Sequence, residues 1–290
     1  MITLDTIKGA HSGPYVVILG SVHGNERVGA MVVDALSEIL KSEQSVKKMH
    51  GMLDLIVGNP RAYAANTRFI DYDLNRLFIE DRVDDAPTSS YEVQRAEELK
   101  PYLRKADYLL DIHSTIKPSV PFVYTEDTPR HMELAKLFCT QYIVSAEKTF
   151  RPRELVSSAD TFVDSYGGIG LTYESGWHKD ISKFEHVLER THNFLSAIGV
   201  IGNRSKNANK ELAATPNHVS RLVIYDHVIP ATDHFKFASN FSNFDQISAG
   251  SVIAHDGGKN ITAPRDSFII FPKEHIGVGR VACYLAYDKP

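Results

Sequence analysis

The chain has 290 residues, of which 43% are hydrophobic and 23% are charged, the composition of a globular protein with a full core. A formal charge of −4 gives no basis for a nucleic-acid partner, and no apolar run is long enough to span a membrane. Two distant cysteines, Cys139 and Cys283, and an N-terminus without signal-peptide features predict a cytoplasmic protein.

The first strong pattern is an apolar run over residues 15–19 that leads into His23, Gly24 and Glu26. Helical spacing begins near Arg27, and the turn between a buried strand and a helix is where open α/β folds place their chemistry. An imidazole and a carboxylate three residues apart are able to bind one zinc ion, and Gly24 would let the backbone turn tightly between them. Because such a pair also occurs among exposed loop residues, the downstream sequence has to decide.

Strand and helix patterns then alternate along the chain. Buried strands are predicted over 53–60, 107–114, 121–124, 141–145 and 170–176, and helices over 90–104, 131–139 and 158–166. Ser182 and Glu185 form a capping-box pattern that predicts the start of a further helix. The alternation predicts an α/β fold with a mostly parallel sheet covered by helices on both sides.

The composition changes at Gly202. A polar, aperiodic stretch predicts a linker over 202–217. Beyond it the helical period is absent, and short strands are predicted over 221–229, 234–238, 251–255 and 267–271. We therefore expect a large α/β domain over 1–201 and a small all-β domain over 218–290.

Polar groups end three of the predicted strands. His23 and Glu26 follow the first, Asp111 and His113 lie on the third, and Glu174 ends the last. The carboxyl ends of parallel strands converge in space, and two histidines with one carboxylate leave a coordination position open, as in catalytic zinc sites. Asp111 is placed to orient a ligating imidazole, and Glu174 to accept a proton from water.

The loop after the second strand allows two interpretations. Arg68, Asn75 and Arg76 should open onto the same sheet edge, where a guanidinium clamps a substrate carboxylate or stabilises an oxyanion. Alternatively, Asp71 and Asp73 pair with these arginines and only hold the loop. The residues by themselves leave both interpretations open.

Five motifs together resemble the succinylglutamate desuccinylase/aspartoacylase family, which belongs in fold with the zinc carboxypeptidases. They are HGNE at 23–26, NPRA at 59–62, RFIDYDLNRLF at 68–78, DIHS at 111–114 and YESG at 173–176. The resemblance implies a three-layer zinc-carboxypeptidase-like domain with a mostly parallel central sheet, followed by a C-terminal β-domain that shapes access to the site. It also implies one Zn²⁺ per chain, held by His23, Glu26 and His113.

The resemblance further implies roles for the residues around the metal. Glu174 would be the general base and acid, and Arg68 would polarise the scissile carbonyl. Asn75 and Arg76 would hold the α-carboxylate of an N-acyl amino acid.

The sequence departs from the family where substrate choice is decided. Aspartoacylases carry another arginine shortly before the catalytic glutamate, but the interval 160–168 contains none, and Arg151 and Arg153 lie further upstream. A substrate-contacting tyrosine of the aspartoacylase tail also has no clear counterpart. Neither the acyl group nor the amino acid of the substrate is therefore assigned.

These observations predict a zinc-dependent hydrolase that removes the acyl group from an N-acyl amino acid or a related small amide. A zinc carboxypeptidase acting on short peptides is one alternative, and a catalytically silent binding protein of the same fold is another. The expected partner is a small acylated amino acid, without nucleic acid or membrane, and the oligomeric state is left open, a homo-oligomer included.

Overall fold

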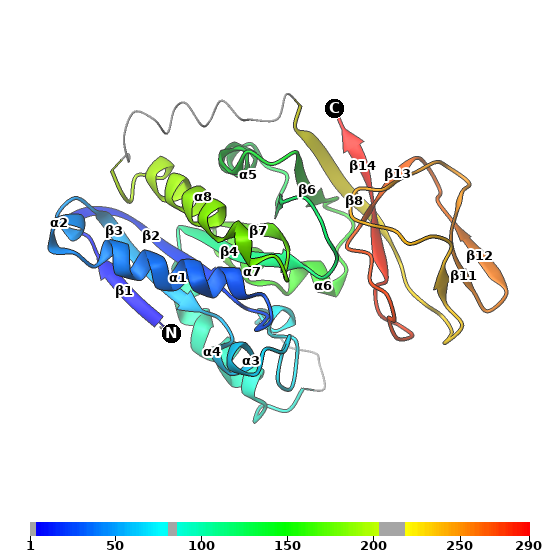
Figure 1. Ribbon diagram of the computed structural model, residues 1–290, viewed down its shortest axis with the longest axis horizontal. Coiled ribbons are helices and arrows are strands. Elements are labelled where there is room, and N and C mark those ends of the chain that lie inside the picture. The colour runs from blue at the N-terminus through cyan, green and yellow to red at the C-terminus, as the bar shows by residue number, and fades with distance from the viewer. Residues whose placement is uncertain (1–3, 81–85, 203–217) are drawn as a thin grey trace.

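The computed structural model describes residues 4–80, 86–202 and 218–290. One sheet of 11 strands runs through this part of the chain in the order β1-β3-β2-β4-β7-β5-β6-β8-β14-β13-β10 (Figure 1). Its strands are β1 (Leu4–Lys8), β2 (His11–Gly20), β3 (His50–Val57), β4 (Tyr108–Thr115), β5 (Phe122–Thr125), β6 (Tyr142–Ala146), β7 (Ile169–Trp177), β8 (Ser220–Val228), β10 (Gln246–Ile247), β13 (Ser267–Ile270) and β14 (Cys283–Lys289). Parallel pairs join β3, β2, β4 and β7, and also β5, β6 and β8, while β5 runs antiparallel to β7. The predicted mostly parallel central sheet is confirmed.

Helices cover both faces of this sheet. Helices α1 and α8 pack on one face and α4 and α7 on the other, which gives three layers (Figure 1). The helices and helical turns are α1 (Arg27–Leu40), α2 (Glu43–Val46), α3 (Pro60–Ala65), η1 (Leu74–Arg76), α4 (Tyr91–Leu103), α5 (Pro129–Ala135), η2 (Lys136–Phe138), α6 (Arg153–Val156), α7 (Ala159–Ser165), η3 (Ile181–Lys183) and α8 (Phe184–Ala197). Among the described residues, no helix is both long and apolar enough to cross a membrane.

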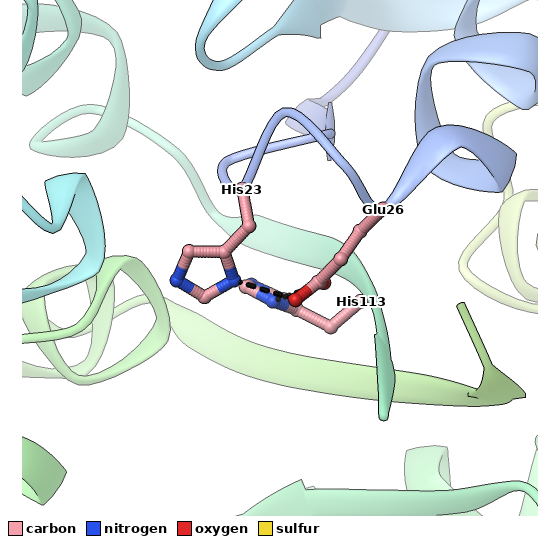
Figure 2. Close-up of side chains that lie close together, drawn as sticks. All are labelled: His23, Glu26 and His113. Atoms are coloured by element: carbon pink, nitrogen blue, oxygen red, sulfur yellow. Dashed lines mark hydrogen bonds and ion pairs between the residues drawn. The ribbon is translucent and has the colours of Figure 1, made fainter. Parts of the chain in front are cut away.

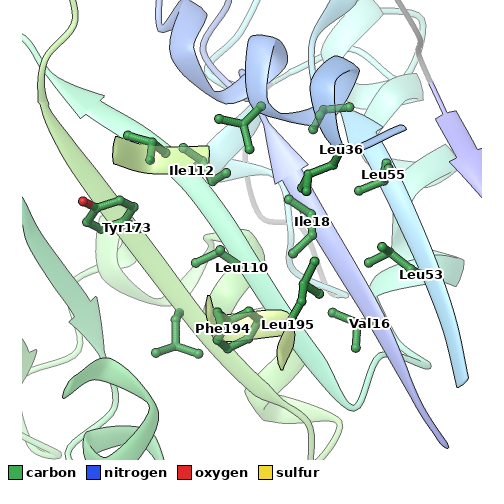
Figure 3. Packing of buried hydrophobic residues seen from close by; sticks show 14 of the residues in the cluster. Val16, Ile18, Leu36, Leu53, Leu55, Leu110, Ile112, Tyr173, Phe194 and Leu195 are labelled. Carbon is green, nitrogen blue, oxygen red and sulfur yellow. The ribbon is translucent and has the colours of Figure 1, made fainter. Parts of the chain in front are cut away.

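Strand β2 shows why the central strands read as continuous apolar runs. Val16 and Ile18 pack in the cluster of α1 and α8 (Figure 3), and Val17 and Leu19 pack in the cluster of α4 and α7. Alternate side chains of a strand point to opposite faces, so a strand buried on both faces must be apolar at every position. Each such side chain contributes roughly 1.5–3 kcal/mol when it is fully buried.

The all-β C-terminal part continues the main sheet. Strand β8 pairs in parallel with β6 and antiparallel with β14, and a separate three-stranded sheet follows the order β12-β11-β9. Its strands are β9 (Lys236–Phe237), β11 (Val252–Asp256) and β12 (Lys259–Thr262). The division into 1–201 and 218–290 stays a prediction, and most of the predicted linker, residues 203–217, lies outside the described residues.

The predicted capping box at the start of the last helix of the α/β part is wrong. The carboxylate of Asp180 accepts a hydrogen bond from the Ser182 backbone N–H at 3.1 Å and opens the 3₁₀ turn η3 instead. Helix α8 follows directly at Phe184, and its N-cap residue, Lys183, makes no side-chain cap. The Ser182 N–H, which the Glu185 carboxylate would accept in a capping box, is therefore already bonded to Asp180.

Candidate active site

The alternation of side chains along β4 and β7 places His113 and Glu174 on one face of the sheet. Leu110 and Ile112 of β4, and Tyr173 of β7, pack in the cluster of α1 and α8. His113 and Glu174 therefore face the opposite side, and the strand register pairs them directly. Two residues 61 positions apart become lateral neighbours through this pairing.

The turn between β2 and α1 brings His23 and Glu26 to the same place. It begins at Ser21, which has a φ of 53° and so reverses the chain at the end of the strand. The Ser21 hydroxyl donates to the backbone oxygen of Glu26 at 2.7 Å and accepts from the Ala30 N–H at 3.1 Å. These two contacts fix the turn against the first helical residues.

Gly24 is required for a reason that the sequence did not reveal. Its φ lies outside the left-handed region, so no special backbone conformation explains it. A Cβ at this position would lie 2.0 Å from the carbonyl carbon of Ala62, and the Gly24 N–H donates to the backbone oxygen of Arg68 at 3.1 Å. The expected tight turn at Gly24 is confirmed, because the Glu26 N–H donates to the backbone oxygen of His23 at 3.0 Å, and the glycine is needed in addition where this turn closely approaches α3 (Pro60–Ala65).

Two imidazoles converge on one carboxylate at this point (Figure 2). Nδ1 of His23 lies 2.8 Å from Oε1 of Glu26, and Nδ1 of His113 lies 3.0 Å from Oε2. The Ser114 N–H also donates to Oε2, at 2.9 Å. All three side chains are buried, and their ligand atoms lie within 4.8 Å of one another. The predicted metal ligands thus form one compact donor set.

The outer nitrogens of both imidazoles contact carboxylates. Nε2 of His113 lies 2.8 Å from Oδ2 of Asp111, and Nε2 of His23 lies 3.1 Å from Oδ1 of Asp73. Histidines that ligate metals commonly donate their second ring N–H to such a partner. Burial raises the pKa of Glu26, but the two histidines outweigh it and hold that pKa well below its usual range. Two imidazoles and an ionised carboxylate are the donor chemistry of a zinc site with an open position.

Glu174 lies beside this donor set with one oxygen unused. Its side chain is buried, and Oε2 has no hydrogen-bond partner among the residues that the structure describes. Burial raises the pKa of Glu174 to about 8, against the opposing effect of His113. The carboxylate is therefore suited to exchange a proton near neutral pH.

The loop that carries Arg68, Asn75 and Arg76 combines parts of both interpretations, binding at the site and pairing within the loop. Arg68 pairs with Asp73, with Nη2 3.1 Å from Oδ2, and its Nη1 lies 3.6 Å from Oε1 of Glu26. Asp71 instead accepts a hydrogen bond from the Tyr91 N–H at 3.0 Å, so the alternative of an Asp71–arginine pair is wrong for the described contacts. Asp71 is drawn to the start of α4, where an acidic side chain satisfies an unpaired helix N–H. Arg68 is thus fixed at the edge of the donor set.

Asn75 and Arg76 lie next to the start of α7. Oδ1 of Asn75 accepts a hydrogen bond from the Ala159 N–H at 3.2 Å, and Nη1 of Arg76 donates to the backbone oxygen of Asn75 at 2.6 Å. Both residues line the cavity that holds the donor set. The structure therefore brings all seven predicted site residues to one cavity.

This cavity has a volume of about 110 Å³ and includes side chains that the sequence reasoning missed. They come from distant elements: Tyr124 from β5, Asp160 from α7, Lys273 from the segment before β14, and Tyr284 from β14. No local pattern marks Lys273 or Tyr284, because only the pairing of β14 with β8 brings that part of the chain here. Asp160 lies in the interval in which an arginine was sought.

The two arginines upstream of the interval 160–168 do not reach the cavity. Arg151 pairs with Glu126 at 2.6 Å, and Arg153 is exposed on α6. Neither lines the cavity, so neither replaces the arginine that is missing from the interval 160–168.

Comparison with known proteins shows which family the chain resembles. Residues 12–195 match the succinylglutamate desuccinylase/aspartoacylase catalytic domain. A succinylglutamate desuccinylase of Vibrio campbellii is 26% identical over 285 residues, which cover 94% of this chain and 80% of that protein. A probable aspartoacylase of Acaryochloris marina is 32% identical over 125 residues, 41% of each chain.

Solved structures share the fold. The succinylglutamate desuccinylase of Vibrio parahaemolyticus superposes with a TM-score of 0.76 at 19% identity, over 99% of this chain and 86% of that one. The succinylglutamate desuccinylase/aspartoacylase of Rhodobacter sphaeroides gives 0.73 at 20% identity, over 99% and 89%. With the matching catalytic-domain model covering more than half of its length, the chain belongs to the succinylglutamate desuccinylase/aspartoacylase family.

Proposed function

We propose that the chain is a zinc-dependent hydrolase that cleaves the amide bond of an N-acyl amino acid. The observation that carries the proposal is the buried set His23, Glu26 and His113, next to a carboxylate with a free oxygen in the same cavity. The family relatives support it, because they are named as a desuccinylase and a probable aspartoacylase.

His23, Glu26 and His113 would hold one zinc ion per chain. Bound zinc in a site of this kind polarises a carbonyl and lowers the pKa of water. Asp111 contacts Nε2 of His113, and Asp73 contacts Nε2 of His23. Nδ1 of each imidazole therefore faces the carboxylate of Glu26. These contacts fix the ring orientation before any ligand arrives.

Glu174 would move the proton. As general base it takes a proton from the water that attacks the carbonyl carbon, and as general acid it delivers that proton to the nitrogen whose C–N bond breaks. The products are a free carboxylic acid and an amino acid. A pKa raised to about 8 by burial supports both halves of this transfer near neutral pH.

Arg68, Asn75 and Arg76 would bind the substrate. Arg68 lies beside Glu26 and would donate to the carbonyl oxygen as negative charge develops on it. Arg76 and Asn75, held together next to α7, would bind the α-carboxylate, because a guanidinium matches a carboxylate with two parallel hydrogen bonds.

A substrate panel tests the proposal. Zinc-loaded protein is assayed for release of free amine from N-acetyl and N-succinyl amino acids and from dipeptides that differ at the C-terminus. We expect N-acyl amino acids with a free α-carboxylate to be hydrolysed, and their α-amides to be poor substrates. Faster cleavage of dipeptides would identify a carboxypeptidase, and tight zinc binding without any turnover would identify a binding protein. The cytoplasmic location expected from the sequence stays a prediction.

A further inference from the structure

The cavity contains one buried carboxylate that the proposed mechanism does not use. Asp160 lies in the first turn of α7, its residue is 2% exposed, and it lines the cavity with the metal-binding set. Its Oδ1 is buried and has no hydrogen-bond partner among the described residues. A buried charged group is costly unless it is paired, so this oxygen calls for a physical explanation.

The position of Asp160 in a helix does not supply that explanation. An acidic residue in the first turn is favoured by the exposed N–H groups there, and the Ser158 hydroxyl and the Thr161 N–H do stabilise the ionised form. Burial nevertheless wins and raises the pKa of Asp160 to about 6. The other acid of this helix behaves differently, because Oδ1 of Asp164 contacts Nε2 of His131 at 2.9 Å and the Gly170 N–H at 2.7 Å.

Among the described residues, no ion pair is found for Asp160. The charged neighbours with the largest effect on the pKa of Asp160 are Asp164 and Asp111, both acidic. Lys273 also lines the cavity, and the charges that affect its pKa most are those of Arg76, Arg68, Asp73 and Glu154. One side of the cavity is thus lined by the cationic side chains Arg68, Arg76 and Lys273, and on the side at α7 Oδ1 of Asp160 is unpaired among the described residues.

These two sides are adjacent through a direct contact. Asn75, which would bind the α-carboxylate, accepts a hydrogen bond from the N–H of Ala159, the residue before Asp160. An amino acid held by Asn75 and Arg76 would therefore lie next to the first turn of α7, where Asp160 lines the same cavity. The group that matches Asp160 there is a hydrogen-bond donor with a positive charge.

We propose that Asp160 selects an N-acylated diamino acid, by pairing with the protonated amine of the side chain. This inference rests on the proposed function and adds the class of amino acid to it. It also explains why the interval 160–168 contains no arginine, because an arginine there would repel the side-chain ammonium of such a substrate.

The test compares matched substrates on the zinc-loaded protein. Nα-Acetylornithine, Nα-acetylnorvaline and Nα-acetylglutamate share a side-chain frame but end in an ammonium, a methyl group and a carboxylate. We expect kcat/KM for the ornithine compound to exceed that for the norvaline compound by about 10- to 100-fold, the size of one charge-assisted hydrogen bond, and the glutamate compound to be the poorest. Asp160→Asn should bring the ornithine-to-norvaline ratio close to one, and Asp160→Glu should restore part of it.

Glu154→Gln is the matched control, because Glu154 also lines the cavity but is only partly buried. It should leave the ornithine-to-norvaline ratio within about threefold of that of the parent, as expected for a solvated charge. Three results would overturn the inference without contradicting the proposed deacylase function. They are a loss of the ornithine preference in Glu154→Gln, an equal loss of both rates in Asp160→Asn, and a parent protein that prefers the norvaline or the glutamate compound.

Binding separates this inference from the proposed function. If the parent hydrolyses no compound, the proposed function fails, and calorimetry then compares free ornithine with free norvaline on the zinc-loaded protein. Ornithine should bind at least about 10-fold more tightly, and Asp160→Asn should remove the difference. Equal affinities in the parent would refute the role of Asp160.

Discussion

Replacing Glu92 by glutamine should loosen the loop that carries the arginines of the site. The Glu92 carboxylate is 0% exposed and accepts four hydrogen bonds. The donors are the Asn59 side-chain amide at 3.0 Å and the backbone N–H groups of Ile70 at 2.7 Å, Asp71 at 2.9 Å and Tyr72 at 3.1 Å. Each carboxylate oxygen accepts from two of these donors. Glutamine has the same volume but carries an NH₂ group in place of one oxygen, so two of the four donors lose their acceptor.

The size of the effect follows from those contacts. Two buried donors without an acceptor cost roughly 1–3 kcal/mol each, and we expect Glu92→Gln to lower the free energy of unfolding by about 3 kcal/mol. Arg68 and Arg76 are on the same loop, and a displacement of about 1 Å lowers a rate on the order of 10²-fold. A fall of that order in kcat/KM should therefore accompany the lost stability.

Urea unfolding of the zinc-loaded protein measures the stability, and the hydrolysis assay measures kcat/KM. The control is Glu98→Gln in the same helix, whose side chain is 64% exposed and pairs with Arg95 at 3.0 Å. An exposed pair of this kind contributes about 0–1 kcal/mol, so Glu98→Gln should be close to the parent in both assays. If Glu92→Gln unfolded like Glu98→Gln and kept its activity, the loop would be held by something other than Glu92.

Three further predictions concern the site itself. His113→Ala should lower the zinc content well below one per chain, because two protein ligands hold zinc poorly, and full retention of metal would show that the ligands are wrong. Glu174→Gln should keep its zinc and its fold but lose turnover by a factor on the order of 10²–10⁴, and near-normal turnover would contradict the assigned base. Arg76→Ala should mainly raise KM, whereas Arg68→Ala should mainly lower kcat, by ~10²-fold or more. Steady-state kinetics decide between these two effects, and the opposite pattern would exchange the roles of the arginines.

The central strands could be predicted from sequence because both of their faces are buried. Uninterrupted apolar residues such as those of β2 and β4 leave little choice of structure, and polar groups at their ends mark the edge where chemistry gathers. The proposed ligands and Glu174 could be predicted for this reason. The structure adds the lateral register of β4 and β7, which makes His113 and Glu174 neighbours.

Other features depend on contacts that leave no local pattern. The first strand, β1, is paired only along β3 at the edge of the sheet, and β14 joins the main sheet by pairing with β8 and β13. Asp73 reads as a partner for an arginine, but it also contacts His23, 50 residues away in sequence. Lys273 and Tyr284 reach the cavity only after the C-terminal strands have extended the sheet. Sequence spacing carries no information about such neighbours.

The most direct measurement is the hydrolysis of an N-acyl amino acid by metal-free protein as zinc is added back. The protein is stripped with a chelator, its fold is checked by circular dichroism, and the initial rate of amine release is followed against zinc added per chain. One buried set of two histidines and one carboxylate in the described part of the chain predicts a background rate without metal and a linear rise that ends at one zinc per chain. Hydrolysis at the full rate by the metal-free protein would contradict the account.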